Sequence, residues 1–312
     1  MAKKATREAY GEALKKLAAS NPNVVVLDAD LSGSTKTVEF KKVCPERFYN
    51  VGIAEQNLIG TAAGMAIAGK VAFASTFAMF AAGRAFEIIR NTVAYPSLNV
   101  KIAATHAGLT VGEDGASHQA IEDISLMRSI PNMTVINPAD CIEAEKAILK
   151  AAEYVGPVYI RLGRAAVENI YDDSYEFEIG KGVELRKGTD VTIIATGLMV
   201  QKSLKAAEEL EKDGISARVI NIHTIKPIDK DIIIQAAKET GAIVTAEEHS
   251  IIGGLGSAVL EVLSDSCPVP LKRVGVLDVF GESGKPDELL EKYHLTENNI
   301  LQECKNIIKQ KK

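Results

Sequence analysis

The chain has 312 residues, 46% of them hydrophobic, and its 36 Lys and Arg residues against 41 Asp and Glu residues leave a net charge of -5. A chain of this length and composition can bury a large core and is more typical of two domains than of one. Because it has no basic excess, the sequence argues against binding to nucleic acid or to an anionic membrane surface.

Strands and helices alternate along the first part of the chain. Apolar residues recur at helical spacing from Thr6 to Ala19, and the run from Val24 to Leu27 predicts a buried strand. That strand ends in the polar loop 28–34, at the position where α/β proteins place ligands. Asp140 has Glu143 three residues later, which is the spacing of a capping box at the start of a helix. The other elements predicted in this part are helices at 55–68, 80–95 and 140–153 and strands at 71–74, 100–105, 133–136 and 158–161.

The alternation lapses between Ala165 and Asp190, where Asp, Glu, Tyr and Gly replace the periodic pattern. We therefore predict a first domain at 1–170, a linker at 171–190 and a second, smaller α/β domain at 191–312. Apolar runs without strict alternation are typical of strands covered on both faces, so both sheets should be largely parallel. The elements predicted in the second domain are strands at 191–195, 217–222, 242–246 and 272–276 and helices at 200–212 and 229–238.

The cysteines and the N-terminus indicate the cellular compartment in which the protein is expected. Four cysteines lie far apart with no paired spacing, which argues against a metal-binding knuckle and against a disulfide framework. The N-terminus runs into a polar helix, and no apolar stretch is long enough for a signal core or a membrane span. We expect a reducing, cytoplasmic location. The cysteines are Cys44, Cys141, Cys267 and Cys304.

Three segments of the first domain are candidates for chemistry. Glu55 starts a helix rich in Gly and Ala, although an isolated acid there would often do no more than complement the helix dipole. Phe77 and Phe80 lie three residues apart in a chain with 5% aromatic residues, a pattern that alone would fit core packing. The stretch 105–119 gathers two of the five histidines and two acids in a glycine-rich loop after a strand. A solvated loop does not require that mixture.

A fourth group of candidates is spread along the sequence. Asp30 and Ser34 follow the first predicted strand, while Arg7 precedes it and Arg161 ends the last strand of the first domain. Lone arginines are usually surface residues, so solvated charges are the alternative interpretation of Arg7 and Arg161. In the second domain, the glycine-rich segment 253–258 lacks the full dinucleotide fingerprint, and close helix packing is the better interpretation.

In this order and at these spacings, the four groups resemble the transketolase family, in the half that carries the pyrimidine-binding and C-terminal domains. The resemblance extends over essentially all 312 residues. It implies an α/β fold with a pyrimidine-binding domain of the thiamine-diphosphate enzymes, followed by the smaller transketolase C-terminal domain. The segments that carry it are Ile-Ala-Glu-Gln at 53–56, Ser-Thr-Phe at 75–77, the stretch 105–118, Ile-Pro-Asn at 130–132 and Pro-Ala-Asp at 138–140.

The resemblance implies a site for the pyrimidine ring of thiamine diphosphate. Glu55 would lie in an apolar pocket beside the ring nitrogen N1′ and share a proton with it, as buried carboxyl groups can. Phe77 and Phe80 would line the flat ring. The family often has another aromatic residue where this chain has Gly83, so the pocket would be looser or completed differently. Asp30 matches an acid near the coenzyme and the subunit interface.

The resemblance also implies a site for sugar phosphates. Arginine forks suit the phosphate group, and neutral polar groups suit the hydroxyls. Asp114 and His118 would bind hydroxyls, and a histidine titrating near neutrality, His106 or His118, could relay protons as a catalytic group. The positions that match the phosphate-binding residues of the family are Arg7, Ser34, His106 and Arg161.

The chain lacks the Gly-Asp-Gly motif with which thiamine diphosphate enzymes hold the diphosphate and its Mg²⁺ or Ca²⁺. Glu113 and Asp114 alone would not provide the geometry or the phosphate ligands of such a site, so we assign no metal ligands to this chain. The resemblance therefore implies an N-terminal transketolase subunit that holds the diphosphate and the metal. We expect a homodimer of this chain within an α2β2 complex, with the coenzyme shared between the two kinds of subunit.

The implied reaction is the reversible transfer of a two-carbon ketol unit from xylulose 5-phosphate to ribose 5-phosphate or erythrose 4-phosphate, as in the pentose phosphate pathway. A 1-deoxy-D-xylulose-5-phosphate synthase is one alternative, but it usually lacks the Thr105-His106 pair. The β subunit of a 2-oxo acid dehydrogenase is another, although its loop normally lacks the run 112–119. A non-catalytic scaffold subunit is a third alternative, from a different functional class.

Overall fold

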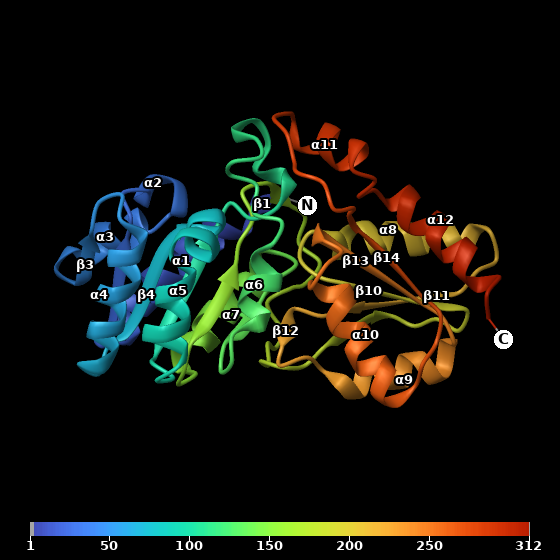
Figure 1. Ribbon diagram of the computed structural model, residues 1–312, viewed down its shortest axis with the longest axis horizontal. Helices are drawn as coiled ribbons and strands as arrows, with labels where there is room; N and C mark the ends of the chain where they lie inside the picture. Colours follow the sequence, from blue (N-terminus) through green and yellow to red (C-terminus); the bar gives the residue numbers. More distant parts are fainter. Residues whose placement is uncertain (1–2, 312) are drawn as a thin grey trace.

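The computed structural model describes residues 3–311 and contains two α/β domains, each built around a mostly parallel sheet with helices on both faces (Figure 1). This arrangement confirms the predicted fold class. Within residues 3–311, no helix is both long enough and apolar enough to cross a membrane. A short antiparallel pair, β1 (Lys4–Ala5) with β8 (Ala166–Val167), joins the two ends of the first domain.

The sheet of the first domain has seven strands within the described residues. All neighbours pair in parallel except one edge strand, which comes from the second half of the chain and runs antiparallel. In spatial order, the strands are β12 (Thr224–Lys226), β6 (Thr134–Ile136), β7 (Val158–Arg161), β5 (Val100–Thr105), β4 (Val71–Phe77), β2 (Val24–Asp28) and β3 (Phe48–Asn50).

Helices cover both faces of this sheet and bury its apolar side chains in two clusters. On one face, α1 (Thr6–Ser20), α3 (Val38–Val43) and α7 (Cys141–Glu153) pack against the strands. On the other face lie α4 (Glu55–Ile67), α5 (Phe86–Ile88) and α6 (Asp123–Ser129). The shorter elements are α2 (Ser32–Thr35), the 3-10 turns η1 (Pro45–Arg47) and η4 (Leu109–Asp114), and the π-helical turns η2 (Phe80–Arg84) and η3 (Ile89–Ala94).

The predicted elements of the first domain are present with two differences. The helix predicted at 80–95 is divided into η2, α5 and η3, so its side chains do not follow one uniform helical period. The strand predicted at 71–74 continues to Phe77, which brings that ring to the end of the sheet. Asp140 caps α7 as predicted, because its side chain accepts a hydrogen bond from the backbone N–H of Glu143.

The second domain has a five-stranded sheet in which only the last pair is antiparallel. Its strands, in spatial order, are β14 (Leu271–Val276), β13 (Ile243–Ser250), β10 (Val191–Ala195), β11 (Ala217–Asn221) and β9 (Val183–Arg186). The helices α8 (Met199–Lys212) and α12 (Glu297–Ile308) cover one face, and α9 (Lys230–Thr240) and α10 (Leu255–Ser266) cover the other. The short helix α11 (Pro286–Lys292) lies beside the loop around η4 (Figure 1).

The segment expected to be a linker contains a strand. The strand β9 lies within residues 171–190 and pairs with β11, so the sheet of the second domain begins earlier than the apolar pattern indicates. The burial pattern explains the difference, because none of the four β9 residues is fully buried. An edge strand of this kind does not produce the continuous apolar run by which buried strands are identified.

A buried carboxyl group ties the two domains together. Glu143 of α7 accepts hydrogen bonds from the N–H of Ala139 at 2.6 Å, from the Tyr175 hydroxyl at 2.7 Å and from the Asn221 amide at 2.9 and 3.0 Å. Tyr175 belongs to the connecting segment, and Asn221 is the last residue of β11 in the second domain. The first domain, the connection and the second domain therefore meet at one fully buried side chain.

Replacing Glu143 with Gln should reduce the pH dependence of stability. Burial raises the pKa of Glu143 from 4.5 to about 7, so between these pH values the folded chain keeps a proton that the unfolded chain releases. The contribution of this carboxyl to the free energy of unfolding is thus greatest below pH 4.5 and falls as the pH rises toward 7. We expect Glu143→Gln to be destabilised by about 1–2 kcal/mol at pH 5, where it loses a buried hydrogen bond, and by less at pH 8.

Urea denaturation between pH 5 and pH 8 measures this difference. Glu153→Gln, at the exposed end of the same helix, is the matched control and should leave the pH profile unchanged. A Glu143→Gln deficit that stays constant over the whole pH range would contradict the assignment.

Candidate active site

The parallel register of three strands brings most of the predicted site residues to one edge of the first sheet. In this register Asp28 of β2 lies opposite Ser75 of β4, and Phe77 of β4 lies opposite Thr105 of β5. The carboxyl ends of the strands consequently end at a common level, which is the ligand-binding edge of open α/β sheets. The loops that follow carry Asp30, Phe80 and His106.

Glu55 lies at the first position of α4 and is 2% exposed. Its carboxylate accepts a hydrogen bond at 2.7 Å from Arg84, whose side chain is half exposed. The Arg84 guanidinium also lies 4.7 Å from the centre of the Phe80 ring. Glu55 is therefore buried, but its surroundings are not apolar, because they contain the Arg84 cation, which sequence reasoning missed.

Four rings form a cluster beside this pair. The Phe77 ring stacks on the His106 imidazole with centroids 3.8 Å apart and lies 6.0 Å from the Phe80 ring. His118 meets both phenylalanines edge-on, at 6.2 and 5.3 Å. The structure thus brings together the aromatic and histidine residues that the sequence placed in two separate segments.

His106 is held as a neutral imidazole. Arg7 approaches its Nε2 at 2.9 Å, and because a guanidinium only donates, Nε2 must be the acceptor. The Nδ1–H then donates to the Thr105 hydroxyl at 2.8 Å. Burial, followed by the positive charges of Arg7 and Arg164, lowers the pKa of His106 to about 3. A relay by a histidine that titrates near neutrality is therefore not supported for His106.

Arg7 connects His106 to the loop after β2. Its guanidinium donates to the backbone carbonyl of Ser34 at 3.0 Å, so the Ser34 contact is through the main chain. Burial, followed by the charge of Arg164, lowers the pKa of Arg7. The Arg7 Nε is buried without a partner among the described residues, which leaves this donor of the guanidinium unused.

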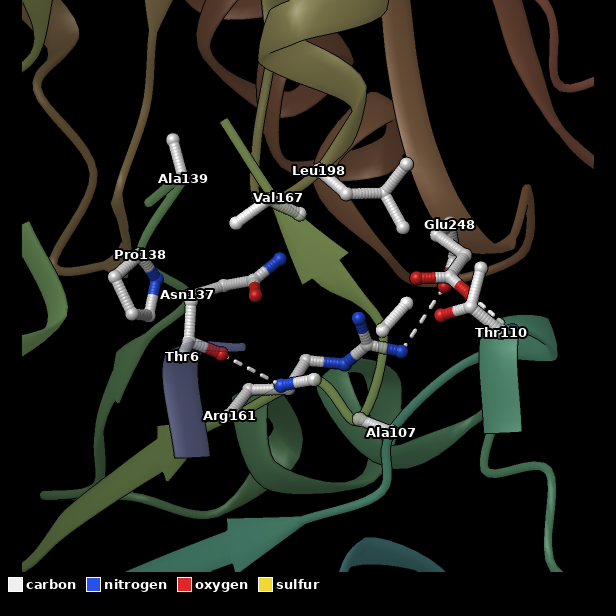
Figure 2. Close-up of a pocket in the computed structure, with 12 residues that line it drawn as sticks. Thr6, Ala107, Thr110, Asn137, Pro138, Ala139, Arg161, Val167, Leu198 and Glu248 are labelled. Atoms are coloured by element: carbon white, nitrogen blue, oxygen red, sulfur yellow. Dashed lines mark hydrogen bonds between the residues drawn. The ribbon is translucent and has the colours of Figure 1, made fainter. Parts of the chain in front are cut away.

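Arg161 lies apart from this cluster. It is 4% exposed, and its guanidinium donates to the Asp123 carboxylate at 2.8 Å and to the Glu248 carbonyl at 3.0 Å. Figure 2 shows it at a cavity of ≈ 30 Å³ between the two domains, beside Glu248 and Asn137. The structure therefore places Arg161 in the domain interface, where its Nε and Nη2 groups already have protein partners.

Arg164 lies closer to the other candidates than Arg161 does. It is partly exposed, contacts the carboxylate of Asp114 at 3.5 Å and that of Glu113 at 3.7 Å, and donates to the carbonyl of Val111. Its charge acts on both Arg7 and His106. Sequence reasoning missed it, although one signal was available: Arg164 follows the end of strand β7 and enters a loop, whereas Arg161 still belongs to the strand.

The two other acids predicted for the site, Asp30 and Asp114, are exposed. Asp30 has a left-handed backbone with a φ of 65° and accepts a hydrogen bond from the Asn50 side chain at 2.8 Å. Asp28, two residues earlier, is fully buried and accepts from Leu31 and from the hydroxyls of two threonines, so it organises this loop from within. Around exposed Gly83, an added Cβ would meet only the Met79 sulfur, at 3.5 Å, so the place of the missing aromatic side chain is open.

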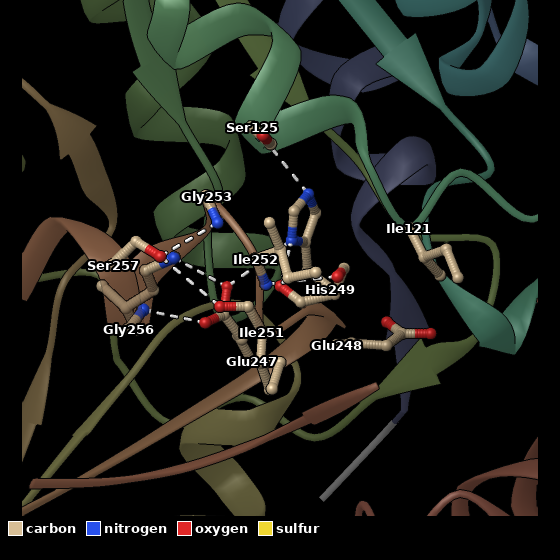
Figure 3. Close-up of polar contacts among 12 residues, drawn as sticks. Ile121, Ser125, Glu247, Glu248, His249, Ile251, Ile252, Gly253, Gly256 and Ser257 are labelled. Carbon is tan, nitrogen blue, oxygen red and sulfur yellow. Dashed lines mark hydrogen bonds and ion pairs between the residues drawn. The ribbon is translucent and has the colours of Figure 1, made fainter. Parts of the chain in front are cut away.

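The glycine-rich segment of the second domain packs as predicted and offers no nucleotide loop. It starts α10, and the Glu247 carboxylate accepts hydrogen bonds from the first two N–H groups of the helix, at Leu255 and Gly256 (Figure 3). A Cβ added to Gly254 would lie 2.0 Å from the same carboxylate. The anion-binding end of this helix is thus already occupied by a side chain of the protein.

The residues present fit the pyrimidine end of thiamine diphosphate. Glu55 and Phe80 both contact the Arg84 guanidinium, so the carboxylate and the ring face adjoin the same planar group. A carboxylate can bind a ring nitrogen, and an aromatic side chain can line a flat ring. Displacement of the half-exposed Arg84 side chain would open both contacts at once.

Comparisons with known proteins identify the family of the chain. The family model for the transketolase pyrimidine binding domain matches residues 2–169, and that for the transketolase C-terminal domain matches residues 180–300. A protein of Methanocaldococcus jannaschii described as a transketolase C-terminal section is 57% identical over 300 residues, 95% of this chain and 94% of that protein. The 6-deoxy-6-sulfo-D-fructose transketolase subunit SqwH of Clostridium sp. (strain MSTE9) is 45% identical over 98% of this chain and 95% of its own length.

A solved structure described as a split gene transketolase, inactive beta4 tetramer, has a TM-score of 0.93 to this chain. Its sequence is 58% identical, and the match covers 99% of each chain. Two family models that together cover nearly the whole chain, and relatives this similar over their full lengths, show that the protein belongs to the transketolase family, a family of transferases.

Proposed function

We propose that this chain is the C-terminal subunit of a split transketolase and that it is active only with an N-terminal partner. The observation that carries the proposal is a continuous series of contacts at one sheet edge. It runs from Glu55 through Arg84 to Phe80, and from Phe77 through His106 to Arg7. A carboxylate, an aromatic surface and a cation therefore lie in sequence, as a coenzyme ring followed by a phosphorylated sugar would require.

Glu55 and the phenylalanines serve the coenzyme in this proposal. Thiamine diphosphate, when bound, supplies the carbon nucleophile that accepts the two-carbon unit. Glu55 would contact the aminopyrimidine in place of Arg84 and would hold a proton at the ring nitrogen. Phe77 and Phe80 exclude water from one face of the ring, which strengthens the interaction at Glu55.

The cations and neutral polar groups serve the sugar phosphate. The Arg7 Nε has no partner among the described residues. We propose Arg164 in place of Arg161 as the second phosphate-binding arginine, because Arg164 is partly exposed, whereas Arg161 is buried and its Nε and Nη2 groups bind protein acceptors. His106 contributes a neutral imidazole, while Asp114 and His118 are proposed to bind hydroxyl groups. We propose xylulose and ribose phosphates as the first substrates to assay. The same donors would also bind a sulfonate, and a relative is described as a 6-deoxy-6-sulfo-D-fructose transketolase subunit.

The partner is proposed to hold the diphosphate and its Mg²⁺ or Ca²⁺, since this chain has no Gly-Asp-Gly motif. The similar split-gene chain is described as inactive when only β subunits assemble, which supports a need for a second kind of subunit. We propose an α2β2 complex with shared coenzyme. A cytoplasmic location stays a prediction from the sequence.

The first experiment compares the chain alone with the chain mixed with an N-terminal transketolase subunit. Both samples receive xylulose 5-phosphate, ribose 5-phosphate, thiamine diphosphate and Mg²⁺, and product formation is followed over time. We expect turnover only in the mixture, because only the partner supplies a diphosphate and metal site. Substantial turnover by the chain alone would overturn the proposal.

Replacing Glu55 with Gln should reduce kcat of the assembled enzyme on the order of a hundredfold or more, because proton exchange at the ring nitrogen is lost. Initial rates at saturating substrate give kcat, and calorimetry gives the coenzyme Kd. Glu12→Gln, on the exposed side of α1, is the control and should match the native enzyme. An unchanged rate in Glu55→Gln would favour a scaffold subunit over a catalytic one.

Two arginine variants separate the phosphate site from the domain interface. Arg164→Met should raise KM for ribose 5-phosphate about tenfold or more through loss of a charge-assisted contact, and should affect a short unphosphorylated aldehyde acceptor much less. Arg161→Met should instead lower the thermal midpoint, since it leaves the buried Asp123 carboxylate unpaired. Equal losses with both acceptors in Arg164→Met would argue against a phosphate contact.

A further inference from the structure

The loop after β5 has little regular structure of its own, yet it carries Asp114 and leads to His118. Gly112 and Gly115 both have left-handed φ angles, of 84° and 76°, so the loop turns sharply at each of them. Such a chain is held in one conformation only if other groups pack against it. The structure identifies which groups these are.

One buried side chain links the two halves of this loop to the second domain. Gln119 is 2% exposed, and its amide Nε2 donates to the carbonyls of Leu109 at 3.2 Å and Gly112 at 3.3 Å. The same nitrogen donates to the carbonyl of Glu282 in the second domain, at 2.9 Å. These three carbonyls come from the first residue of η4, from the kink at Gly112 within it, and from a segment more than 160 residues further along the chain.

The segment 281–286, which we call the brace, packs directly on the loop. A Cβ added to Gly281 would lie 1.9 Å from the Gln119 Oε1, so any larger residue there would displace the Gln119 amide. A Cβ added to Gly115 would lie 2.5 Å from the Ser283 hydroxyl, and one added to Gly112 would lie 3.3 Å from the carbonyl of Gly284. The loop and the brace thus approach each other through glycines on both sides.

The brace is anchored in the second domain. It leads into α11, whose Leu289 and Leu290 side chains are buried, and the Tyr293 hydroxyl donates to the Phe280 carbonyl at 3.0 Å. A second tie lies at the start of the loop, where the buried Glu248 carboxylate of β13 accepts the Thr110 N–H at 2.6 Å. The loop is therefore fixed from the second domain at two separate points.

We infer that the second domain positions the substrate loop of the first domain, with Gln119 as the positioning residue and the brace as its support. This inference rests on the proposed function, because it assigns the loop residues Asp114 and His118 to the sugar. Glu55 lies outside the loop, on α4. Loosening the brace should therefore weaken sugar binding and turnover while leaving coenzyme binding intact.

Two variants test this inference at the contact itself. Gln119→Leu keeps most of the side-chain volume but removes the donor, and Gly281→Ala places a methyl group against the Gln119 amide. Glu282→Ala is the matched control, because it removes only an exposed ion pair with Lys292 and keeps the carbonyl that Gln119 uses. Recording thermal unfolding for each protein identifies any variant that fails to fold, and Gln119→Leu and Gly281→Ala each test the contact independently.

Hydrogen–deuterium exchange of the isolated chain reports on the loop without requiring activity. Amides in 105–119 should exchange faster in Gln119→Leu and Gly281→Ala than in the native chain, while amides in 55–67 should not change. In the complex with the N-terminal subunit, kcat/KM for the sugar phosphates should fall on the order of ten- to a hundredfold, and the coenzyme Kd should stay within about twofold. Glu282→Ala should match the native protein in both measurements.

The outcomes separate this inference from the proposed function. Unchanged loop exchange in both variants would overturn the inference, as would faster exchange with native kcat/KM. Equal losses in coenzyme affinity and sugar kinetics would also overturn it, because they would indicate general destabilisation. If the native complex shows no transketolase activity, the proposed function and the catalytic role of the loop both fail, and exchange alone decides whether the brace holds the loop.

Discussion

The arrangement of the candidate site depends on the parallel register of β2, β4 and β5. Side chains alternate between the faces of a strand, so a slip of one residue in β4 would turn Phe77 to the opposite face of the sheet. The ring would then lose its stacking on His106, and the loop that begins at Phe80 would be displaced from Glu55. Every contact at this edge therefore assumes one pairing of three strands, which the two apolar clusters on either side of the sheet hold in place.

The two domains meet through polar groups that are buried and hydrogen-bonded. Arg161 pairs with Asp123 and with a carbonyl of β13, and Glu143 binds Asn221. Removing one member of the buried Arg161–Asp123 ion pair would cost about 3–5 kcal/mol, because the other charge would be left without a partner. Contacts of this kind tolerate little error in geometry. They favour one relative position of the domains, whereas an apolar interface could accommodate small shifts.

Local patterns predicted the regular elements well, because the helix at Thr6 and the strand at Val24 each bury a run of neighbouring apolar residues. The same reasoning could not distinguish Arg161 from Arg164. The difference lies in Asp123, which is 38 residues distant from Arg161 in sequence and in the fold pairs with Arg161 rather than with Arg164. The Arg84 contact with Glu55 was missed for a similar reason, since an irregular helical path brings them together. Spacing therefore located the candidate residues, but long-range partners decide which of them are available to a ligand.

The crossing of β12 into the first sheet has a consequence for dissecting the protein. After β11 the chain leaves the second domain, pairs with β6 along the outer edge of the first sheet, and returns to form α9. A fragment that ends in the connecting segment would lack this strand, and the hydrogen-bonding groups of β6 would face solvent. Uncovered edges of that kind recruit strands from other molecules and promote aggregation. Boundaries for recombinant fragments are thus better chosen from sheet pairing than from the midpoint between the two folded units.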